Sequence, residues 1–373
     1  MEALYANVFN IQWQQLVMWA IGAGLIYLAI AKKMEPALLL PMGFGAILVN
    51  LPMSGAVDQT INGEVELGII DLLFNSGIAN ELFPLLLFVG IGAMIDFGPL
   101  LSNPKLMLFG AAAQFGIFFT LSMAALFGFD LKDAASIAII GAADGPTSIF
   151  VANFFNSKYI GAIVVAAYSY MALVPIVQPP VIRMITTKKE RLIRMPYKHQ
   201  DISKTTRILF PILVTIITGI VAPKAVSLIG FLMFGNLVRE CGVLNSLSET
   251  AQNVLANLIT LFLGITIAAR MQADAFINPE TFLILGLGLI AFVFDTVGGV
   301  FFAKFLNLFS KNKINPMIGA AGISAFPMSA RVVHKMGLQE DKQNFLLMHS
   351  IGVNVSGQIA SVIAGGLILN LIG

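Results

Sequence analysis

The residues Gly141-Ala142-Ala143-Asp144-Gly145-Pro146-Thr147-Ser148-Ile149-Phe150 place an acid and a helix-breaking Gly-Pro pair inside a very apolar sequence. A carboxylate in lipid hydrocarbon costs about 3 kcal/mol or more unless it is paired, hydrated or bound to a cation. Non-helical backbone is tolerated at that depth only where protein buries it or where it lines a watery cavity. The stretch therefore predicts an ion site built from an interrupted helix around Asp144. The alternative is a Gly-Pro kink whose acid lies at the membrane–water interface.

The composition is that of a membrane protein. Of the 373 residues, 57% are hydrophobic and 11% are charged, whereas soluble domains carry about 25% charged residues. The net charge of +2 argues against a nucleic-acid partner. The single cysteine, Cys241, excludes an internal disulfide and a cysteine metal cluster. Residues 1–10 lack a basic start, so we expect no cleavable signal peptide.

Apolar runs recur along the whole chain, and a helix needs about 20 such residues to cross a bilayer. The runs predict an all-α polytopic membrane protein with about ten spanning helices. Two further segments, residues 134–156 and 319–329, are interrupted by glycine and proline or serine. The predicted spans are residues 14–31, 36–52, 82–100, 106–127, 159–182, 208–221, 225–237, 255–269, 282–306 and 345–371.

The two halves of the chain resemble each other. They divide it into an N-terminal membrane repeat at residues 1–183, a basic linker at 184–207 and a C-terminal repeat at 208–373. Transporter folds are commonly built from such repeats, with a scaffold and a core, and their sites lie in interrupted segments at equivalent places in the two halves. The matches are Gly90-Ile91 with Gly264-Ile265 (offset 174), Asn103-Pro104 with Asn278-Pro279 (offset 175), and Gly141-Ala142-Ala143 with Gly319-Ala320-Ala321 (offset 178).

The distribution of basic residues predicts how the chain lies in the membrane, because Lys and Arg favour cytoplasmic loops. If each interrupted segment enters and leaves on one side as a re-entrant hairpin, 18 of the 22 Lys and Arg residues lie inside. Ten spans and two hairpins dipping from opposite faces then give an inverted repeat. The four basic residues left outside are Lys132, Lys158, Lys224 and Arg270.

Two acids within apolar segments are candidate cation ligands. Carboxylate and carbonyl oxygens are the ligands that hard cations prefer, so Asp144 is a candidate to hold Na⁺, or a proton in its place. Asp295 lies in the middle of an apolar span, and an intramembrane acid is functional by default. For Asp295, the alternative is a packing role, with the carboxylate hydrogen-bonded to a hydroxyl.

The last predicted helix carries a polar stripe. Asn354, Gly357 and Ser361 are three and four residues apart, so they share one helix face. They are candidate Na⁺ ligands, although small residues at this spacing are equally typical of helix packing. Tyr168 and Tyr170 lie inside another apolar span, where a buried hydroxyl usually finds a partner. They are candidate proton relays or, alternatively, interfacial aromatics.

Two basic side chains follow the second interrupted segment on the predicted cytoplasmic side. Arg331 and His334 are candidates to hold an anion there. The alternative is that they anchor the loop at the lipid headgroups.

Residues 141–153, GAADGPTSIFVAN, resemble the signature of the β subunits of sodium-pumping, biotin-dependent decarboxylases. These enzymes act on oxaloacetate, methylmalonyl-CoA or glutaconyl-CoA. The resemblance extends over nearly the whole chain. It includes GAMIDFGP at 92–99, AYSYMAL at 167–173, DTVGGV at 295–300, SARVVH at 329–334 and NVSG at 354–357.

The resemblance implies that the chain removes CO₂ from carboxybiotin, which a partner biotin carrier presents, and drives Na⁺ out of the cell. It places the essential aspartate of the family on Asp144, its tyrosine on Tyr170 and its last-helix polar residues on Asn354, Gly357 and Ser361. Relatives have a basic residue near the end of the last helix, where this chain has Asn370.

The resemblance also implies partners and a location. The partners are a biotin carrier subunit, a carboxyltransferase α subunit, a small membrane-anchor subunit and further copies of this chain, in a prokaryotic cytoplasmic membrane. No Ala-Met-Lys-Met motif is present, so the biotin must be on another polypeptide. The modest length of the chain favours the methylmalonyl-CoA or glutaconyl-CoA type.

A rival hypothesis from another class is a secondary transporter of carboxylates or of Na⁺ and H⁺. Inverted repeats with opposed hairpins are found in such carriers as well, so the fold alone does not separate the two functions. CO₂ release from carboxybiotin is the observation that distinguishes them.

Overall fold

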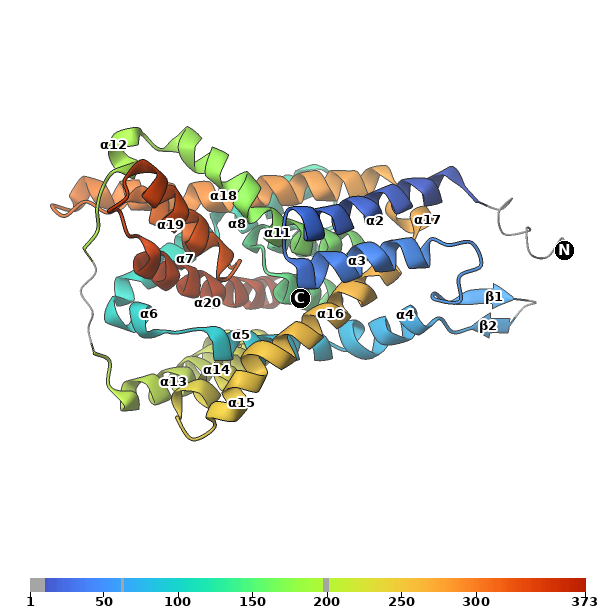
Figure 1. The fold of residues 1–373 in the computed structure, drawn as a ribbon, viewed down its shortest axis with the longest axis horizontal. Coiled ribbons are helices and arrows are strands. Elements are labelled where there is room, and N and C mark those ends of the chain that lie inside the picture. The colour runs from blue at the N-terminus through green and yellow to red at the C-terminus, as the bar shows by residue number, and fades with distance from the viewer. Residues whose placement is uncertain (1–10, 62–63, 197–200) are drawn as a thin grey trace.

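The computed structural model describes residues 11–61, 64–196 and 201–373, and it is predominantly helical (Figure 1). The first residues, 1–10, for which we expect no signal peptide, lie outside the described residues. In Figure 1 the strands β1 (Gln59–Ile61) and β2 (Glu64–Glu66) lie toward one end of the long axis, and α12 (Lys188–Arg191) lies at the other. The chain therefore places its basic linker and the acidic loop that contains β1 and β2 at opposite ends.

Two short strands lie in the polar loop between the second and third predicted spans, and the fold remains that of a helical membrane protein. β1 and β2 pair antiparallel, with Gln59 opposite Glu66 and Thr60 opposite Val65. β-branched side chains such as Thr60 and Val65 suit a pleated surface. The segment is too polar to enter the membrane, so its backbone forms a short ladder instead of a helix.

Seven helical stretches of the described residues are long and apolar enough to cross a membrane. They coincide with seven of the ten predicted spans, and they confirm a polytopic helical membrane protein. The stretches are α2 (Trp13–Ala31); η2 (Pro104–Leu106), α7 (Met107–Ala113) and α8 (Phe115–Leu126) together; α11 (Ile160–Ile185); α13 (Lys204–Val221); α15 (Asn245–Glu249), η5 (Thr250–Leu255), α16 (Ala256–Ile267) and η6 (Ala268–Arg270) together; α18 (Pro279–Phe309); and α20 (Leu347–Ile372).

The other three predicted spans are short or bent. α3 (Pro36–Val49) has 14 residues and α14 (Val226–Glu240) has 15, so each covers only about 22 Å of a hydrocarbon core of about 30 Å. α5 (Leu82–Met94) follows α4 (Ile69–Leu73) and η1 (Phe74–Ala79) with a bend of 58°. Counting the bent pair gives up to eight spans, and ten stays a prediction. Short connecting elements are α6 (Gly98–Ser102), η4 (Pro223–Ala225) and α17 (Ala273–Phe276).

The two halves share an unusual local feature. η1 and η5 are six-residue π-helices, and they begin 176 residues apart. Each follows a five-residue helix and precedes a helix of 12 or 13 residues, α5 after η1 and α16 after η5. π-Helical turns are rare in proteins, so their recurrence at nearly the offset of the sequence matches favours an internal duplication. The inverted relation of the halves stays a prediction.

Two interrupted segments meet inside the molecule, where the Ser324 amide donates to the Ala142 carbonyl. The first consists of α9 (Leu131–Ala138), η3 (Ile139–Ala142) and α10 (Gly145–Phe154), and the second of η7 (Pro316–Gly322) and α19 (Met328–Glu340). Every residue from 134 to 152 is buried. Small residues let α18 approach the second segment closely, because a Cβ on Gly299 would lie 2.1 Å from the Gly319 carbonyl oxygen.

Candidate functional site

The first interrupted helix breaks immediately before the acid that the sequence singles out. Ala143 has a left-handed backbone, with φ of 51°, and Asp144 is the N-cap of α10. Pro146 fits the first turn of a helix because it lacks the amide hydrogen that would have no partner there. Asp144 Oδ1 accepts a hydrogen bond from the Thr147 amide at 3.2 Å, as N-cap acids commonly do. The predicted break is therefore present, and its acid is 3% exposed.

The other carboxylate oxygen of Asp144 is held by side chains from the second half of the chain. Oδ2 accepts hydrogen bonds from Ser361 Oγ at 2.9 Å, Ser324 Oγ at 3.0 Å and Gln358 Nε2 at 3.1 Å. No ion pair to Asp144 occurs among the described residues. Four neutral donors do not cancel a buried negative charge, so the geometry suits a carboxylate that a bound cation or proton neutralises.

Two oxygens of the segments that meet at this carboxylate are buried and have no hydrogen-bond partner. They are Tyr168 Oη and Asn354 Oδ1. Asn354 donates through Nδ2 to the Ile323 carbonyl at 2.7 Å, which leaves its Oδ1 free. An all-oxygen donor set matches a hard cation. The described residues hold no group of three or more His, Cys, Asp or Glu that could bind a metal ion.

The predicted stripe on the last helix reaches the site. Ser361 contacts Asp144 directly, and Asn354 binds the backbone of the second break. Gly357 has a packing role, because a Cβ there would lie 2.1 Å from the Gly322 carbonyl oxygen. The stripe therefore combines the two alternatives, packing at Gly357 and hydrogen bonding at Asn354 and Ser361. Its assignment as Na⁺ ligands stays a prediction.

Sequence reasoning missed two donors to Asp144, Ser324 and Gln358. Gln358 follows the quoted NVSG motif and lies four residues after Asn354 and three before Ser361, which places it on the same helix face. That spacing was a usable signal. Ser324 lies inside the second interrupted segment, and only the folded structure brings it to Asp144.

Asp295 lies apart from the Asp144 hydrogen-bond network. It is fully buried in α18, and its Oδ1 accepts from the Ile117 amide at 3.2 Å. Its Oδ2 has no partner and faces Gly141, where an added Cβ would lie 2.9 Å from it. Asp295 therefore contacts the same break at Gly141, three residues before Asp144. Its metal role stays a prediction.

The two candidate tyrosines occupy different environments. The Tyr170 hydroxyl donates to the Leu285 carbonyl in α18. Tyr168 lies against the break, since a Cβ on Gly145 would be 2.2 Å from its Cζ atom. Tyr168 Oη is one of the free oxygens, so Tyr168 contacts the Asp144 region more directly than Tyr170. The proton-relay role of Tyr170 stays a prediction.

The sequence also matches known proteins throughout its length. A family model described as the Na⁺-transporting oxaloacetate decarboxylase beta subunit covers residues 14–372. The methylmalonyl-CoA decarboxylase subunit beta of Propionigenium modestum is 47% identical over 383 residues, with 98% of this chain and 96% of that protein covered. The chain belongs to this family of decarboxylase β subunits.

Other β subunits of the family are similarly close. The glutaconyl-CoA decarboxylase subunit beta of Acidaminococcus fermentans is 47% identical over 361 residues, with 97% of this chain and 94% of that protein covered. The probable oxaloacetate decarboxylase beta chain of Vibrio cholerae is 43% identical over 421 residues, with 98% and 97% covered. The family resemblance seen in the motifs is confirmed, and the protein is a multi-pass membrane subunit of a Na⁺-transporting decarboxylase.

Of the two basic residues predicted to hold an anion in this β subunit, Arg331 lines a cavity whose lining does not include His334. The cavity measures about 360 Å³ and lies between the α2–α3 turn, α11 and α19. Glu35 faces it, and burial raises the pKa of Glu35 while the Arg331 charge opposes that rise. His334 lies beside Phe345, with ring centroids 6.1 Å apart, and burial lowers its pKa. A role for His334 in holding the anion stays a prediction.

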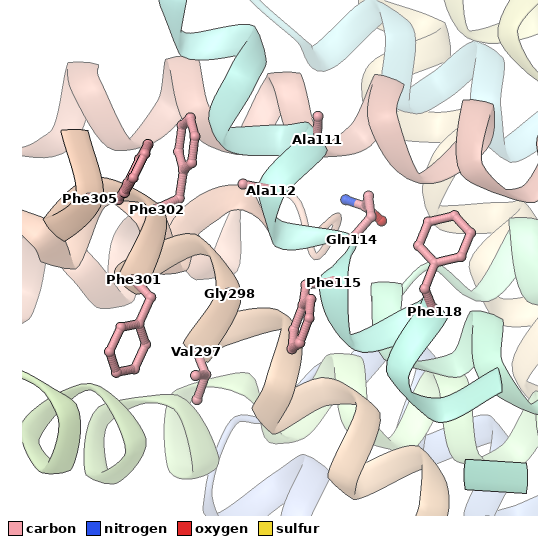
Figure 2. Close-up of a pocket in the computed structure, with 10 residues that line it drawn as sticks. All are labelled: Ala111, Ala112, Gln114, Phe115, Phe118, Val297, Gly298, Phe301, Phe302 and Phe305. Carbon is pink, nitrogen blue, oxygen red and sulfur yellow. The ribbon is translucent and has the colours of Figure 1, made fainter. Parts of the chain in front are cut away.

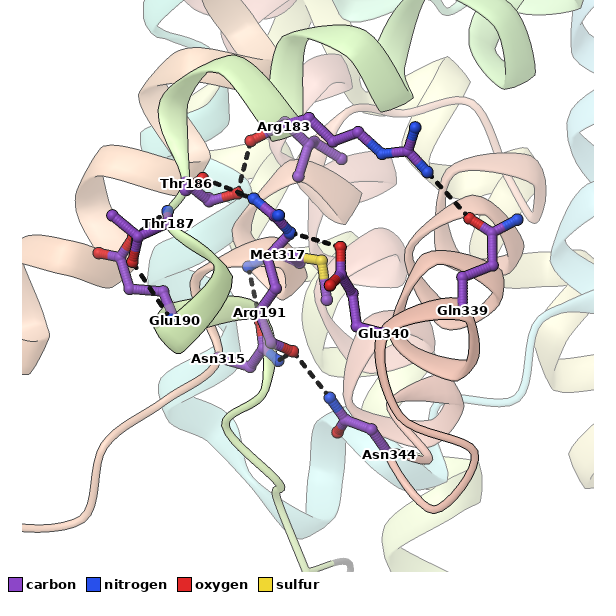
Figure 3. A network of polar contacts seen from close by, with 11 residues as sticks. Arg183, Thr186, Thr187, Glu190, Arg191, Asn315, Met317, Gln339, Glu340 and Asn344 are labelled. Atoms are coloured by element: carbon purple, nitrogen blue, oxygen red, sulfur yellow. Dashed lines mark hydrogen bonds and ion pairs between the residues drawn. The ribbon is translucent and has the colours of Figure 1, made fainter.

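A polar network fastens the basic linker of the β subunit to the second half (Figure 3). Arg191 is at its centre: Nε pairs with Glu340 at 2.7 Å, and Nη1 donates to the Thr186 carbonyl at 2.6 Å. The Arg191 carbonyl accepts from Asn315 and Asn344, each at 2.9 Å. The network joins elements that the charge count places on one side of the membrane.

Another cavity of the β subunit has a different character. It measures about 650 Å³ and lies between the α7–α8 junction and α18, where Phe115, Phe301 and Phe305 border it (Figure 2). Gln114 is the one polar side chain in its lining. Without a charged group, this groove suits apolar contacts such as lipid tails and is no candidate for the ion site.

Proposed function

We propose that this β subunit removes CO₂ from carboxybiotin on a partner carrier and couples that reaction to the export of Na⁺. The Asp144 site is the observation that carries the proposal. Its carboxylate is buried, has four neutral hydrogen-bond donors and no cationic partner among the described residues, and lies where two interrupted helices meet. Such an acid suits alternate neutralisation by Na⁺ and by a proton.

In the proposed reaction, the bond between the carboxyl carbon and the ureido nitrogen breaks, CO₂ leaves with neither charge nor proton, and the nitrogen takes up one proton. Asp144 supplies that proton and binds Na⁺ in its place. Tyr170 or the nearer Tyr168 relays the proton. Movement of the hairpins against the scaffold follows, because a ligand shifts a two-state equilibrium by its differential affinity for the two states.

The remaining site residues have proposed roles of two kinds. Asn354, Ser361 and Asp295 supply oxygens for Na⁺, and Gly357 lets the last helix approach the second break closely enough for that purpose. Arg331, together with His334, holds the carboxylate of the carboxylated cofactor on the cytoplasmic side. Support comes from the free oxygens of Asn354 and Asp295 and from the position of Arg331 on a cavity.

The proposed complex is of the methylmalonyl-CoA or glutaconyl-CoA type. Alignments to those relatives span 383 and 361 residues, close to the length of this chain, while alignments to the oxaloacetate relatives span 412 to 421 residues. The proposed partners are a biotin carrier, a carboxyltransferase α subunit, a small membrane anchor and further copies of this chain. The proposed architecture is an inverted pair of repeats, residues 1–183 and 208–373, each with five spans and one re-entrant hairpin.

Reconstitution tests the function. Purified protein in proteoliposomes receives free carboxybiotin, and CO₂ release and ²²Na⁺ movement are measured with and without Na⁺. The proposal predicts CO₂ release that requires Na⁺ and moves it across the membrane. The rival carrier function predicts movement of a dicarboxylate down its gradient with no CO₂ release, and that result would overturn the proposal.

A further inference from the structure

The cavity beside Arg331 is strongly basic. Lys32 and Lys33 enter its lining from the α2–α3 turn, and Arg331 and Lys335 enter it from α19. Glu35 is the one acid in the lining. In the part of the chain that the structure describes, none of the four cations makes an ion pair within 4.0 Å. Four positive charges against one carboxylate leave a surplus that an anionic ligand would neutralise.

The cations come from two separately packed parts of the molecule. α2 and α3 pack against each other, and α3 packs on α16, whereas α19 packs on α20, α11 and η7. Lys32 and Lys33 therefore face Arg331 and Lys335 across a boundary between packing units. Like charges repel across such a boundary unless an anion lies between them. The occupancy of the cavity by an anion thus affects how closely the two parts approach.

The cavity also lies on a short route to Asp144. Tyr168 on α11 contacts the break at Gly145, and Ala172 and Pro175 on the same helix line the cavity. At 1.5 Å per residue, these two positions lie about 6 and 10 Å further along α11, toward the basic linker. A ligand in the cavity is therefore one to two helical turns along α11 from Tyr168, the residue that contacts the break beside Asp144.

We infer that this cavity binds the carboxylated head group of the cofactor and that its carboxylate acts as an electrostatic latch between the α2–α3 turn and α19. The inference rests on the proposed function and assigns Lys32, Lys33 and Lys335 to it. A volume of about 360 Å³ is at the small end of ligand pockets, about 300–1,000 Å³, so it suits a head group and not a folded domain. When CO₂ leaves, the anion disappears, the cations repel, and the cavity opens.

Cysteine accessibility tests the inference without relying on turnover. Cys241→Ser removes the single cysteine, and Met328→Cys then places a reporter in the cavity lining. Maleimide labelling of that cysteine is timed in Na⁺-free buffer, in vesicles of neutral lipid, with carboxybiotin or with biotin. We expect carboxybiotin to slow labelling at least about fivefold, and biotin, which lacks the ureido carboxylate, to change it less than about twofold.

Charge variants supply the specificity control. In the reporter background, Lys33→Gln with Lys335→Gln is expected to raise the carboxybiotin concentration for half-protection about tenfold. Lys311→Gln with Lys342→Gln removes two exposed lysines that do not line the cavity, and it should leave that concentration unchanged.

Three results would overturn the inference. The first two are equal protection by biotin and protection that survives the loss of Lys33 and Lys335. The third is slow labelling in anionic lipid vesicles without carboxybiotin, which would assign the cavity to phosphate headgroups. If wild-type protein still releases CO₂ in a Na⁺-dependent way, the proposed function stands without the latch. Protection without any CO₂ release would instead remove the proposed function and leave an anion site.

Discussion

The Ser324 amide donates a 2.9 Å hydrogen bond to the Ala142 carbonyl, so the two interrupted helices meet backbone to backbone. The side chain of the same serine donates to Asp144 Oδ2. Any movement of one break past the other must therefore change the hydrogen bonds of Asp144 at the same time. This coupling gives cation binding a direct mechanical consequence, because each arrangement of the breaks has its own affinity for the cation.

Asp144→Asn should abolish Na⁺-dependent CO₂ release, with a fall of about 100-fold or more, since an amide cannot balance a cation or deliver a proton. The neutral side chain keeps the shape of the acid and can still accept hydrogen bonds, so folding should persist. The measurement is CO₂ release and ²²Na⁺ uptake in proteoliposomes. Asp274→Asn, at an exposed position in α17, is the matched control and should be near wild type. Normal turnover in Asp144→Asn would refute the assignment.

Ser324→Ala and Ser361→Ala should each weaken Na⁺ binding, because each hydroxyl holds the same carboxylate oxygen in place and offers its own oxygen to the cation; the two hydroxyl oxygens lie 3.1 Å apart. A hydrogen bond to a charged group contributes about 1.5–3 kcal/mol, which corresponds to a rise of roughly tenfold or more in the KM for Na⁺.

The double variant distinguishes a shared site from two separate effects. Because the serines share a partner, their costs should not add, and a coupling of about 0.5–3 kcal/mol is expected. The cycle is measured from the Na⁺ dependence of CO₂ release in the four proteins. Strict additivity would mean that the two serines act on separate sites.

Gly357→Ala should destabilise the protein and impair Na⁺ binding. The added Cβ would lie 2.1 Å from the Gly322 carbonyl oxygen, which is backbone and cannot turn away. Overpacking of this kind costs about 1–3 kcal/mol, and relief requires α20 to move away from the second break. Gly286→Ala is the control, because a Cβ there meets nothing within 4 Å. Thermal unfolding in detergent should show a loss for Gly357→Ala and none for Gly286→Ala.

Local signals in the sequence predicted the break at Asp144 and the polar face of the last helix, because caps, glycine, proline and helical spacing act over a few residues. These local signals do not predict contacts between segments that are distant in the sequence. Ser324 reaches Asp144 only because the two halves pack together, and nothing local distinguishes it from its neighbours. For the same reason, the residue pattern did not separate Tyr168 from Tyr170, and the family resemblance singled out Tyr170, while packing brings Tyr168 to the break. The strands β1 and β2 were missed because a polar loop carries no apolar periodicity.

Low pH should weaken the polar network that fastens the basic linker, because Glu190 belongs to that network (Figure 3). Partial burial raises the pKa of Glu190, but hydrogen bonds from Thr187 and the Lys304 ammonium, 3.1 Å away, outweigh that effect and hold the pKa below its ordinary 4.5. A group whose folded-state pKa is lowered contributes stability above its unfolded pKa, and that stability is lost as the pH falls through the folded value.

The melting temperature of the wild type should therefore fall more steeply below about pH 4.5 than that of Glu190→Gln. Glu249→Gln, at an exposed position outside the network, should keep the wild-type pH profile. If the melting temperatures of Glu190→Gln and the wild type depend on pH in the same way, Glu190 does not stabilise the polar network of the linker.

Arg191→Ala should release the linker from the second half of the chain. Its side chain is 14% exposed and that of Glu340 is 16% exposed, so the substitution leaves a largely buried acid without its partner, at a cost of about 2–3 kcal/mol. Arg194 offers a matched control, because it pairs with Asp341 but is 57% exposed, and exposed pairs contribute about 0–1 kcal/mol. Thermal unfolding and limited proteolysis of the linker should show a clear loss for Arg191→Ala and little change for Arg194→Ala. Equal effects of the two substitutions would mean that the network in Figure 3 holds the linker by its total charge and not through the Arg191 contacts.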